Sequence, residues 1–280
     1  GYILCLLGGF ILSWGGLIIR SFETNDIWQI LLIRSLFFII ALTIFLFIKY
    51  KKNTIKEIKK SGVQAIIAGL FLSLSFVAYV VAMSKTTVAN VVFIISTQTI
   101  FLALFGFLFL KEKITFKGLI AITLAFLGML VMVGDSINQG TLFGNIVAFA
   151  IPINFTILVM IIRKFPDLDM VPAIFYSGIF SGMYGLLLAN NLTFSSNDIL
   201  MGFLLGVPQL AFGFICVTIG TKTTPAVTVG LLMLLETIFA PIWVWIFLNE
   251  TPPLSVFTGG AIIIFAVILK SFDKSKKLST

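Results

Sequence analysis

The sequence predicts an all-α integral membrane protein of ten transmembrane helices, arranged as two inverted five-helix repeats with both termini in the cytoplasm. Three observations predict this fold: the composition, a series of long apolar segments, and a motif that occurs twice. Of the 280 residues, 59% are hydrophobic and 11% are charged, and the mean hydropathy is +1.15. A soluble domain with so few charges cannot cover its surface with polar groups. Lipid is therefore the expected solvent for most of the chain.

Crossing the hydrocarbon core of a bilayer takes roughly 20 helical residues. Apolar segments of about this length follow one another along the whole chain, and the polar connections between them are too short to separate soluble domains. The expected spans are Tyr2–Ile19, Ile27–Ile48, Val63–Met83, Val88–Leu110, Ile114–Val133, Leu142–Ile162, Met170–Ala189, Ile199–Ile219, Ala226–Leu248 and Leu254–Leu269. Thr224 and Pro225 predict the start of the ninth span, with threonine as its cap and proline in its first turn.

A diverged duplication divides the chain into two halves. The matching pairs are Lys85–Ala89 with Lys222–Ala226, Gln98–Phe101 with Glu236–Phe239, and Phe109–Glu112 with Phe247–Glu250. The expected domains are residues 1–135 and residues 136–280, the second ending in a short basic tail. Each half contains five spans, and an odd number of spans turns the second half upside down relative to the first. Inverted repeats are typical of secondary transporters.

The distribution of Lys and Arg sets the expected orientation, because cytoplasmic loops retain cations. Only Arg20 and Lys85 fall on the outer side, and Arg34 lies within a span. All other cations fall on the inner side: Lys49, Lys51, Lys52, Lys56, Lys59, Lys60, Lys111, Lys113, Lys117, Arg163, Lys164, Lys222, Lys270, Lys274, Lys276 and Lys277. Anionic inner-leaflet lipids account for the net charge of +8 without a nucleic-acid partner.

Several classes of function are disfavoured by residues that the chain lacks. It has no histidine, and Cys5 and Cys216 both lie in apolar segments, where each is expected to pack as a small hydrophobic side chain. We therefore expect no metal, no cofactor and no disulfide. A membrane enzyme would need a nucleophile, a metal cluster or an acid–base pair at one membrane face, and no such group of residues is evident.

Three motifs give the chain a family resemblance. They are Ser13-Trp14-Gly15 in the first span, Arg34 in the second, and the sequences Leu110-Lys111-Glu112 and Leu248-Asn249-Glu250 that end the fourth and ninth spans. The chain resembles the EamA-type family of the drug/metabolite transporter superfamily over essentially its whole length. The resemblance implies a transporter of small organic metabolites in the plasma membrane, which is the inner membrane of a bacterium. We expect a monomer or a homodimer. The resemblance does not distinguish amino acids from nucleosides, cofactors or drugs.

Glu236 is the most informative residue within a span. It lies about eleven residues from either end of its helix, which places it near the bilayer midplane. An intramembrane acid usually faces a cavity or a partner, so we expect Glu236 to exchange a proton or to pair with a substrate ammonium. The alternative is a protonated acid that hydrogen-bonds a neighbouring helix. Gln98 occupies the equivalent depth in the other repeat and is expected at the same cavity, with an interhelical hydrogen bond as the alternative.

Arg34 lies roughly 10 Å below the outer end of its span, at the expected depth of Trp14. The two side chains are expected to share an outer vestibule, where the guanidinium binds a substrate carboxylate. The alternative is a structural arginine that satisfies helix-end carbonyls. The repeat relates Arg34 to Tyr176, which is a further candidate lining residue, with core packing as the alternative.

Other polar residues and helix breakers lie in the middle of spans. Tyr79, Asn154 beside Pro152, and Gln209 beside Pro208 are further candidates for contact with substrate. Gly15 and Pro241 add to a set of breaks that suits bending between two open states and is equally compatible with static kinks. Outside this set, Glu112 and Glu250 are expected to pair with cations or helix ends, and Trp28, Trp243 and Trp245 to anchor the interfaces.

The function predicted from the sequence is secondary active transport by alternating access, with efflux of amino acids or related amphipathic solutes. Proton antiport through Glu236 is the expected coupling. An uptake permease or exchanger for a cofactor-like or nucleoside-like solute is the alternative within transport. A channel and a polytopic membrane protein that transports nothing are the alternatives from other classes.

Overall fold

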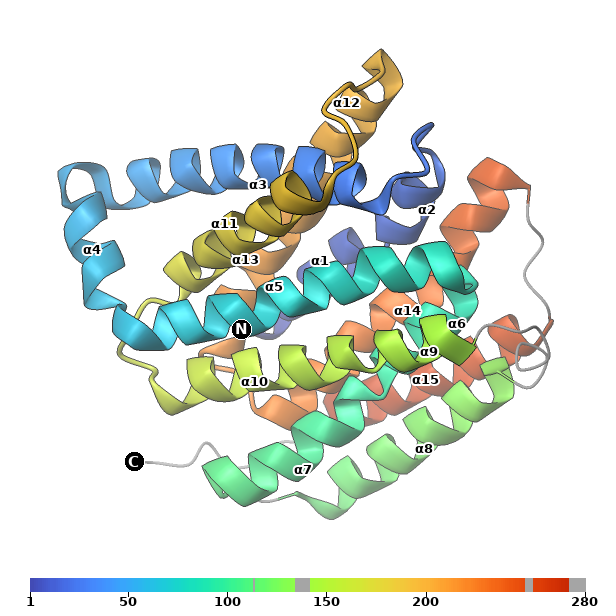
Figure 1. Ribbon diagram of the computed structural model, residues 1–280. Coiled ribbons are helices and arrows are strands. Elements are labelled where there is room, and N and C mark those ends of the chain that lie inside the picture. Colours follow the sequence, from blue (N-terminus) through green and yellow to red (C-terminus); the bar gives the residue numbers. More distant parts are fainter. Residues whose placement is uncertain (113, 134–141, 250–253, 272–280) are drawn as a thin grey trace.

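The computed structural model describes residues 1–112, 114–133, 142–249 and 254–271 (Figure 1). Every regular element in these ranges is helical. The elements are α1 (Tyr2–Leu12), α2 (Gly15–Arg20), α3 (Ile27–Tyr50), η1 (Lys51–Asn53), α4 (Thr54–Lys60), α5 (Gly62–Lys85), α6 (Val88–Ser96), α7 (Gln98–Leu110), α8 (Phe116–Val133), α9 (Leu142–Ala148), α10 (Ala150–Lys164), α11 (Val171–Leu188), α12 (Ser196–Leu204), η2 (Leu205–Ala211), α13 (Phe212–Thr221), α14 (Ala226–Leu248) and α15 (Leu254–Ser271). Glu250 and the expected boundary between repeats lie outside the described residues.

Eight helical runs among the described residues are long and apolar enough to cross a membrane. They coincide with eight of the ten expected spans, and the fifth and tenth expected spans coincide with α8 and α15, each 18 residues long. Apolar residues therefore form one long helix after another, as backbone groups in hydrocarbon require, because only a helix satisfies all of them within one segment. The chain is a multi-pass membrane protein.

Four of the spans are not continuous α-helices, and the sixth is interrupted at Phe149, between α9 and α10. The first breaks between Leu12 and Gly15, and the fourth breaks at Thr97, where no proline is present. The eighth contains the π-helical turn η2, with Pro208 inside it. Pro241 lies within α14, which continues to Leu248 without interruption. Breaks at mid-membrane leave backbone groups available to a cavity or to side chains.

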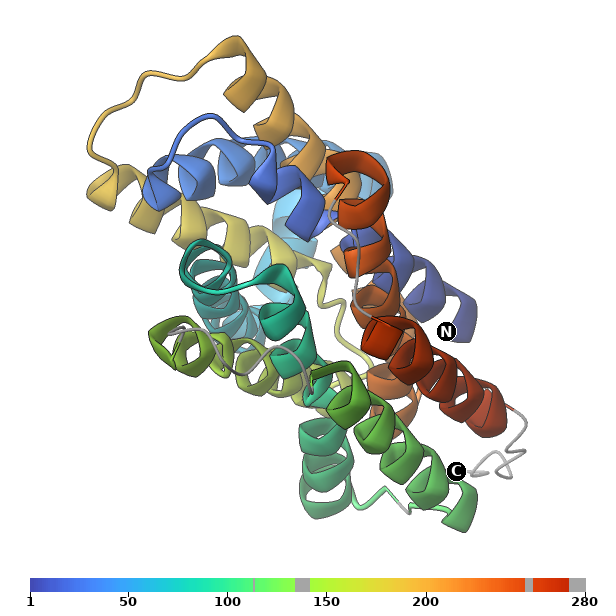
Figure 2. The same ribbon diagram turned by 90° about the vertical axis from the view of Figure 1, so that its right-hand side faces the viewer.

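The contacts between helices pair the first five spans with the last five (Figures 1 and 2). α3 packs on α11, α7 on α14, and α8 on α15. α1 contacts α13, which joins the first span to the eighth, and α5 contacts α10, which joins the third to the sixth. Exchanging the first five spans with the last five maps this set of contacts onto itself. The contacts therefore have the pairing of a two-fold axis between the halves.

The helices that carry the duplicated motif end alike. Lys111 and Asn249 both take a left-handed backbone conformation, with φ of 54° and 56°. After Lys111, the Glu112 carboxylate turns to the start of α14, where Oε2 accepts a 2.9 Å hydrogen bond from the Ala226 amide. The prediction that Thr224 caps this helix is wrong, because its hydroxyl donates to the Gly220 carbonyl instead. Glu112 satisfies the free amide, and its carboxylate is favourable at this helix end.

Glu112 also joins a third helix at the same end of the bundle. Its Oε1 accepts hydrogen bonds from Arg163 Nη2 at 2.8 Å and Nε at 3.1 Å, and Arg163 Nη1 donates to the Lys222 carbonyl. The expectation that Glu112 has a structural role at cations and helix ends is confirmed. One partly buried ion pair thus ties the end of α7 to the end of α10 and the start of α14.

Asp169 makes a second polar connection outside the spans. Its carboxylate accepts hydrogen bonds from Lys49 Nζ, from the Tyr50 hydroxyl and, at 3.0 Å, from the Val171 amide. Burial by itself would raise the pKa of Asp169, but these hydrogen bonds outweigh burial and hold the pKa below its usual range. The carboxylate therefore fastens the end of α3 to the start of α11.

Candidate functional site

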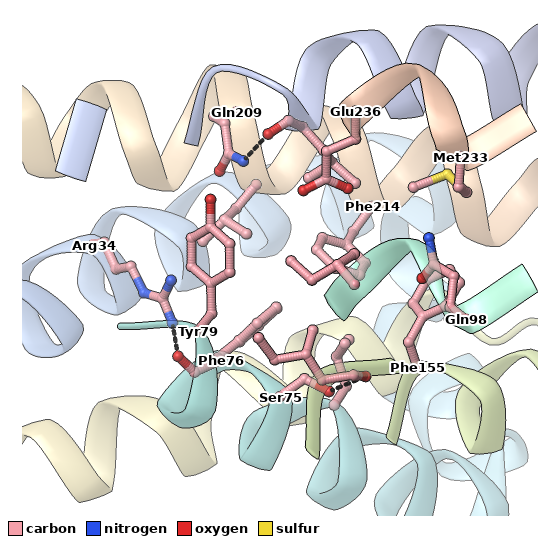
Figure 3. A pocket seen from close by; sticks show the side chains of 15 residues that line it. Arg34, Ser75, Phe76, Tyr79, Gln98, Phe155, Gln209, Phe214, Met233 and Glu236 are labelled. Atoms are coloured by element: carbon pink, nitrogen blue, oxygen red, sulfur yellow. Dashed lines mark hydrogen bonds between the residues drawn. The ribbon is translucent and has the colours of Figure 1, made fainter. Parts of the chain in front are cut away.

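A cavity of about 60 Å³ lies in the middle of the fold, where helices from both halves meet (Figure 3). α14, α5, η2 and α10 supply most of its walls, and α1, α3, α6, α7 and α13 complete them. A space of this size holds a few water molecules. Its lining residues are Leu12, Arg34, Leu72, Ser75, Phe76, Tyr79, Ile95, Gln98, Ile151, Phe155, Gln209, Leu210, Phe214, Met233 and Glu236.

Glu236 projects into this cavity from the middle of α14 (Figure 3). The side chain is 8% exposed and makes no hydrogen bond or ion pair with any residue in the described part of the chain. The nearby walls are apolar, with Met233 one turn earlier on α14 and Phe214 on α13. A carboxylate in such a place needs a proton or a cationic partner, because a buried unpaired charge is very costly.

Arg34 is held on another wall of the cavity by α5. Its side chain is 1% exposed, Nη2 donates to the Phe76 carbonyl at 3.1 Å, and the guanidinium lies 5.1 Å from the centre of the Phe76 ring. Among the described residues, Nε has no hydrogen-bond partner. The guanidinium is thus positioned by one carbonyl and one ring, and no acid in the described ranges neutralises it.

Tyr79 lies between the two charged side chains. It interacts electrostatically with both Glu236 and Arg34, and Figure 3 shows its hydroxyl pointing toward Gln209. Gly15 makes room for this arrangement, because a Cβ there would lie 2.6 Å from the Tyr79 hydroxyl and 2.8 Å from Gln209 Nε2. The glycine in the broken first span therefore lets both polar groups approach the backbone.

Two breaks in the helices position the cavity amides. The break after Leu12 frees its carbonyl, and Gln209 Nε2 donates to that carbonyl at 2.8 Å from the π-helical turn η2. The break at Thr97 makes Gln98 the first residue of α7 and directs it to the cavity. Both amides are almost fully buried. The irregular backbone thus places polar side chains where an unbroken helix would present apolar ones.

The structure brings together five of the eight candidate site residues: Arg34, Tyr79, Gln98, Gln209 and Glu236 all line the cavity. The other three, Trp14, Asn154 and Tyr176, do not. Asn154 is buried in α10 beside the lining residue Phe155, and Tyr176 packs where α11 passes Gly69 of α5.

Trp14 is separated from Arg34 and lines a second cavity. Its ring stacks on Trp243 with centroids 4.2 Å apart, and Trp243 Nε1 donates to the Ser13 hydroxyl at 2.8 Å. Trp243, which was expected to anchor an interface, packs and hydrogen-bonds against the first span through these two contacts. The outer vestibule expected for Arg34 and Trp14 is replaced by two separate spaces.

The apolar lining residues were not singled out from the sequence. Leu72, Ser75, Phe76 and Tyr79 recur at three- and four-residue spacing, which places them on one face of α5. Met233 and Glu236 share a face of α14 for the same reason. The helical period, taken from Tyr79 and Glu236, predicts these neighbours.

The second cavity is larger, about 670 Å³, and lies beside the first. Its walls come from α1 and α2, from α12, η2 and the start of α13, and from the end of α14. Gln209 lines both cavities. The remaining lining residues are Ile11, Trp14, Leu17, Ile18, Ser21, Met201, Leu204, Pro208, Phe212, Phe247 and Leu248.

No group of three or more His, Cys, Asp or Glu side chains in the described ranges is placed to hold a metal ion. The polar groups of the central cavity are one carboxylate, one guanidinium, two amides and two hydroxyls. Such a set can form hydrogen bonds and ion pairs with a small polar or charged molecule.

Comparison with known proteins decides the family. The model of the EamA-like transporter family matches residues 1–134 and again residues 138–272. The chain belongs to the EamA-like transporter family. It is a membrane transporter, and the family implies a small-molecule substrate.

Two relatives of this EamA-like chain are known as uncharacterized transporters. One, from Clostridium kluyveri, is 24% identical over 99% of this chain and 94% of its own length. The other, from Methanothermobacter thermautotrophicus, is 28% identical over 68% of this chain and 59% of its own length. A crystal structure at 13% identity has a TM-score of 0.80 and covers 95% of both chains, which shows the same fold.

Proposed function

We propose that this protein is a secondary active transporter of small organic metabolites that carry an ammonium group, amino acids and related amphipathic solutes first among them. The observation that carries the proposal is the Glu236 carboxylate, which faces a small cavity between the two halves and has no partner among the described residues. A substrate ammonium supplies the missing counter-charge.

Arg34 extends this proposal to substrates that also carry a carboxylate. Its guanidinium lines the same cavity from α3, and its Nε has no partner among the described residues. Tyr79 lies between Arg34 and Glu236 and offers a hydroxyl that donates or accepts. An α-amino acid, with one positive and one negative group, complements this arrangement of charges.

The proposed coupling is proton antiport. When the ammonium leaves, Glu236 is again a buried carboxylate without a counter-charge, and a proton is the smallest ion that neutralises it. A carboxylate that binds either a proton or the substrate exchanges one for the other. The proposed direction is efflux, with protons entering as substrate leaves.

The small volume of the central cavity supports alternating access. At about 60 Å³ it holds a few waters, so an amino acid requires the surrounding helices to separate. The Glu112–Arg163 pair fastens α7, α10 and α14 at one end of the bundle. By the distribution of cations this end is cytoplasmic, in a plasma membrane crossed by ten spans with both termini inside. The two halves rock about the cavity as that contact opens and closes.

The experiment is uptake into proteoliposomes of labelled amino acids and amines, with and without an imposed pH gradient. Wild type is compared with Glu236→Gln and with the matched control Glu23→Gln, which changes an exposed acid in a loop. The expected result is saturable, gradient-driven uptake in wild type and Glu23→Gln, and its loss in Glu236→Gln. Uptake that never saturates and shows no counterflow indicates a channel and contradicts the proposal. Equal, gradient-independent transport by all three proteins contradicts proton coupling.

A further inference from the structure

The larger cavity is apolar except at one point. Ten of its twelve lining residues have apolar side chains, and the other two are Ser21 and Gln209. The Ser21 hydroxyl donates to the Leu17 carbonyl of its own helix, so it needs no ligand. Gln209 is different, and it is also the residue that this cavity shares with the central one.

Half of the Gln209 amide has a partner and half has none. Nε2 donates to the Leu12 carbonyl, which fixes the orientation of the amide, because a carbonyl accepts only from an N–H. Oε1 is fully buried and has no hydrogen-bond partner among the described residues, on a side chain only 5% exposed. An orphaned buried acceptor costs about 1–3 kcal/mol until a donor reaches it. The Tyr79 hydroxyl points toward Gln209 (Figure 3) but makes no hydrogen bond to Oε1, so an N–H or O–H group on a bound molecule would supply the donor that Oε1 lacks.

The Glu236 carboxylate and Gln209 Oε1 each need a hydrogen-bond donor. Both are acceptors without a donor in the described part of the chain, and both side chains line the central cavity (Figure 3). An ammonium group has three N–H donors and one positive charge, so it serves a carboxylate and an amide oxygen at once. The apolar space begins on the other side of Gln209, next to the place where such an ammonium would lie.

We propose that the larger cavity binds the apolar tail of the transported substrate, while its ammonium head lies between Glu236 and Gln209 Oε1. The substrate class is then a primary amine or amino acid with a long alkyl or aromatic side chain. This inference rests on the proposed function and adds the class of substrate that the transporter selects. The walls suit such a tail, since Trp14, Phe212 and Phe247 supply aromatic surface and Leu17, Ile18 and Leu204 supply aliphatic surface.

An acyl chain of a bilayer lipid is the competing occupant. It would fill the apolar space, but its terminal carbon has no donor and leaves Gln209 Oε1 unpaired. Because Gln209 lines both cavities, they lie next to each other, and this adjacency favours a molecule that has a donor at one end and hydrocarbon at the other.

The test measures binding of n-alkylammonium ions, from ethyl to octyl, to the full chain in lipid nanodiscs by titration calorimetry. Two variants fill the cavity from α12, Leu204→Trp and Met201→Trp. Leu200→Trp is the matched control, because Leu200 lies on the same helix, is 51% exposed and does not line the cavity. Burial of each methylene is expected to tighten binding roughly fourfold in wild type and in Leu200→Trp.

The cavity-filling variants are expected to bind ethylammonium as wild type does and to lose the gain with chain length. The inference is overturned if wild type shows no such gain, or if all four proteins show the same gain, because the tail then lies in the bilayer. Glu236→Gln separates this result from the proposed function. If ethylammonium binds that variant as tightly as wild type, the claim that Glu236 binds the ammonium is contradicted. The claim that the larger cavity binds the tail is then tested by the Leu204→Trp comparison alone.

Discussion

The Gln209 side chain donates to the carbonyl of Leu12 across 2.8 Å, and this hydrogen bond joins the two broken spans that border both cavities. Leu12 ends α1, and Gln209 lies in the π-helical turn η2. The two irregularities are complementary. The break after Leu12 leaves its carbonyl without a backbone donor, and the π-helical turn places the Gln209 amide where it can donate to that carbonyl. The pair is also the boundary between the polar cavity and the apolar one.

We predict that Gln209→Leu destabilises the protein by about 1–3 kcal/mol, because it leaves the Leu12 carbonyl buried without a donor. The control is Gln98→Leu, another buried cavity amide, whose side chain makes no hydrogen bond to a described residue. Thermal unfolding in detergent measures both variants. A Gln209→Leu protein no less stable than Gln98→Leu would show that the hydrogen bond contributes nothing.

Two glycines of α11 provide a matched pair for the packing of α11 on α3. A Cβ at Gly185 would lie 2.7 Å from the Leu32 amide nitrogen, whereas a Cβ at Gly182 would meet the Ser35 Cβ at 3.5 Å, an ordinary contact. We expect Gly185→Ala to destabilise by about 1–3 kcal/mol, since backbone must move. Gly182→Ala is expected to be neutral or slightly stabilising, because alanine favours helix over glycine. Equal effects in thermal unfolding would contradict this account of the interface.

Asp169 predicts a pH dependence of stability. Hydrogen bonds from Lys49, Tyr50 and Val171 hold its pKa below the ordinary value against the opposing effect of burial, so the folded state favours the charged form. This contribution is full above the unfolded-state pKa and is lost as the pH falls through the folded-state pKa. Stability is therefore expected to decline below about pH 4, and Asp169→Asn to flatten that decline.

The exposed Asp167, two residues earlier, supplies the control for this measurement. Asp167→Asn is expected to retain the wild-type pH profile when unfolding is followed by denaturant titration at several pH values. An unchanged slope in Asp169→Asn would show that the contact between α3 and α11 does not depend on this carboxylate.

Arg34 is predicted to select substrates with a carboxylate. Arg34→Met removes a buried charge that has no acidic partner among the described residues, so folding is expected to tolerate it. The variant should lose at least tenfold in apparent affinity for an amino acid and little for the amine that lacks the carboxylate. Competition between the two compounds in counterflow measures this. A loss of the same size for both would indicate a structural arginine.

Hydropathy, the duplicated motif and the family resemblance were enough to predict the helices and to find five of the lining residues. The break at Thr97 was not predicted, although the polar run Ser96–Thr99 marks it in the sequence. The Ser96 and Thr97 hydroxyls donate to carbonyls of the preceding turn, which favours a bend without proline or glycine. The stacking of Trp14 on Trp243 could not be predicted from the sequence. Their depth follows from position along a span, whereas the direction of a side chain depends on the neighbouring helix, and here the two indoles stack on each other.

The hydrogen-bond partner of Gln209 could not be predicted from the sequence either. Its neighbour Pro208 predicted an irregular helix, but the partner of the amide lies 197 residues away at Leu12, and only the packing of α1 on η2 brings the two together. Glu112 was assigned correctly to helix ends and cations, yet its partners Arg163 and Ala226 come from two other helices. A single sequence does not show which residues far apart in the chain contact each other.

The most direct test of the central claim, that Glu236 exchanges a proton for the substrate ammonium, is proton release on substrate binding. Substrate is added to purified protein in weakly buffered solutions of increasing pH, and the protons released are counted against substrate bound. The account predicts release approaching one proton per substrate in wild type and in Glu23→Gln, and none in Glu236→Gln. Binding by wild type without proton release at any pH would contradict it.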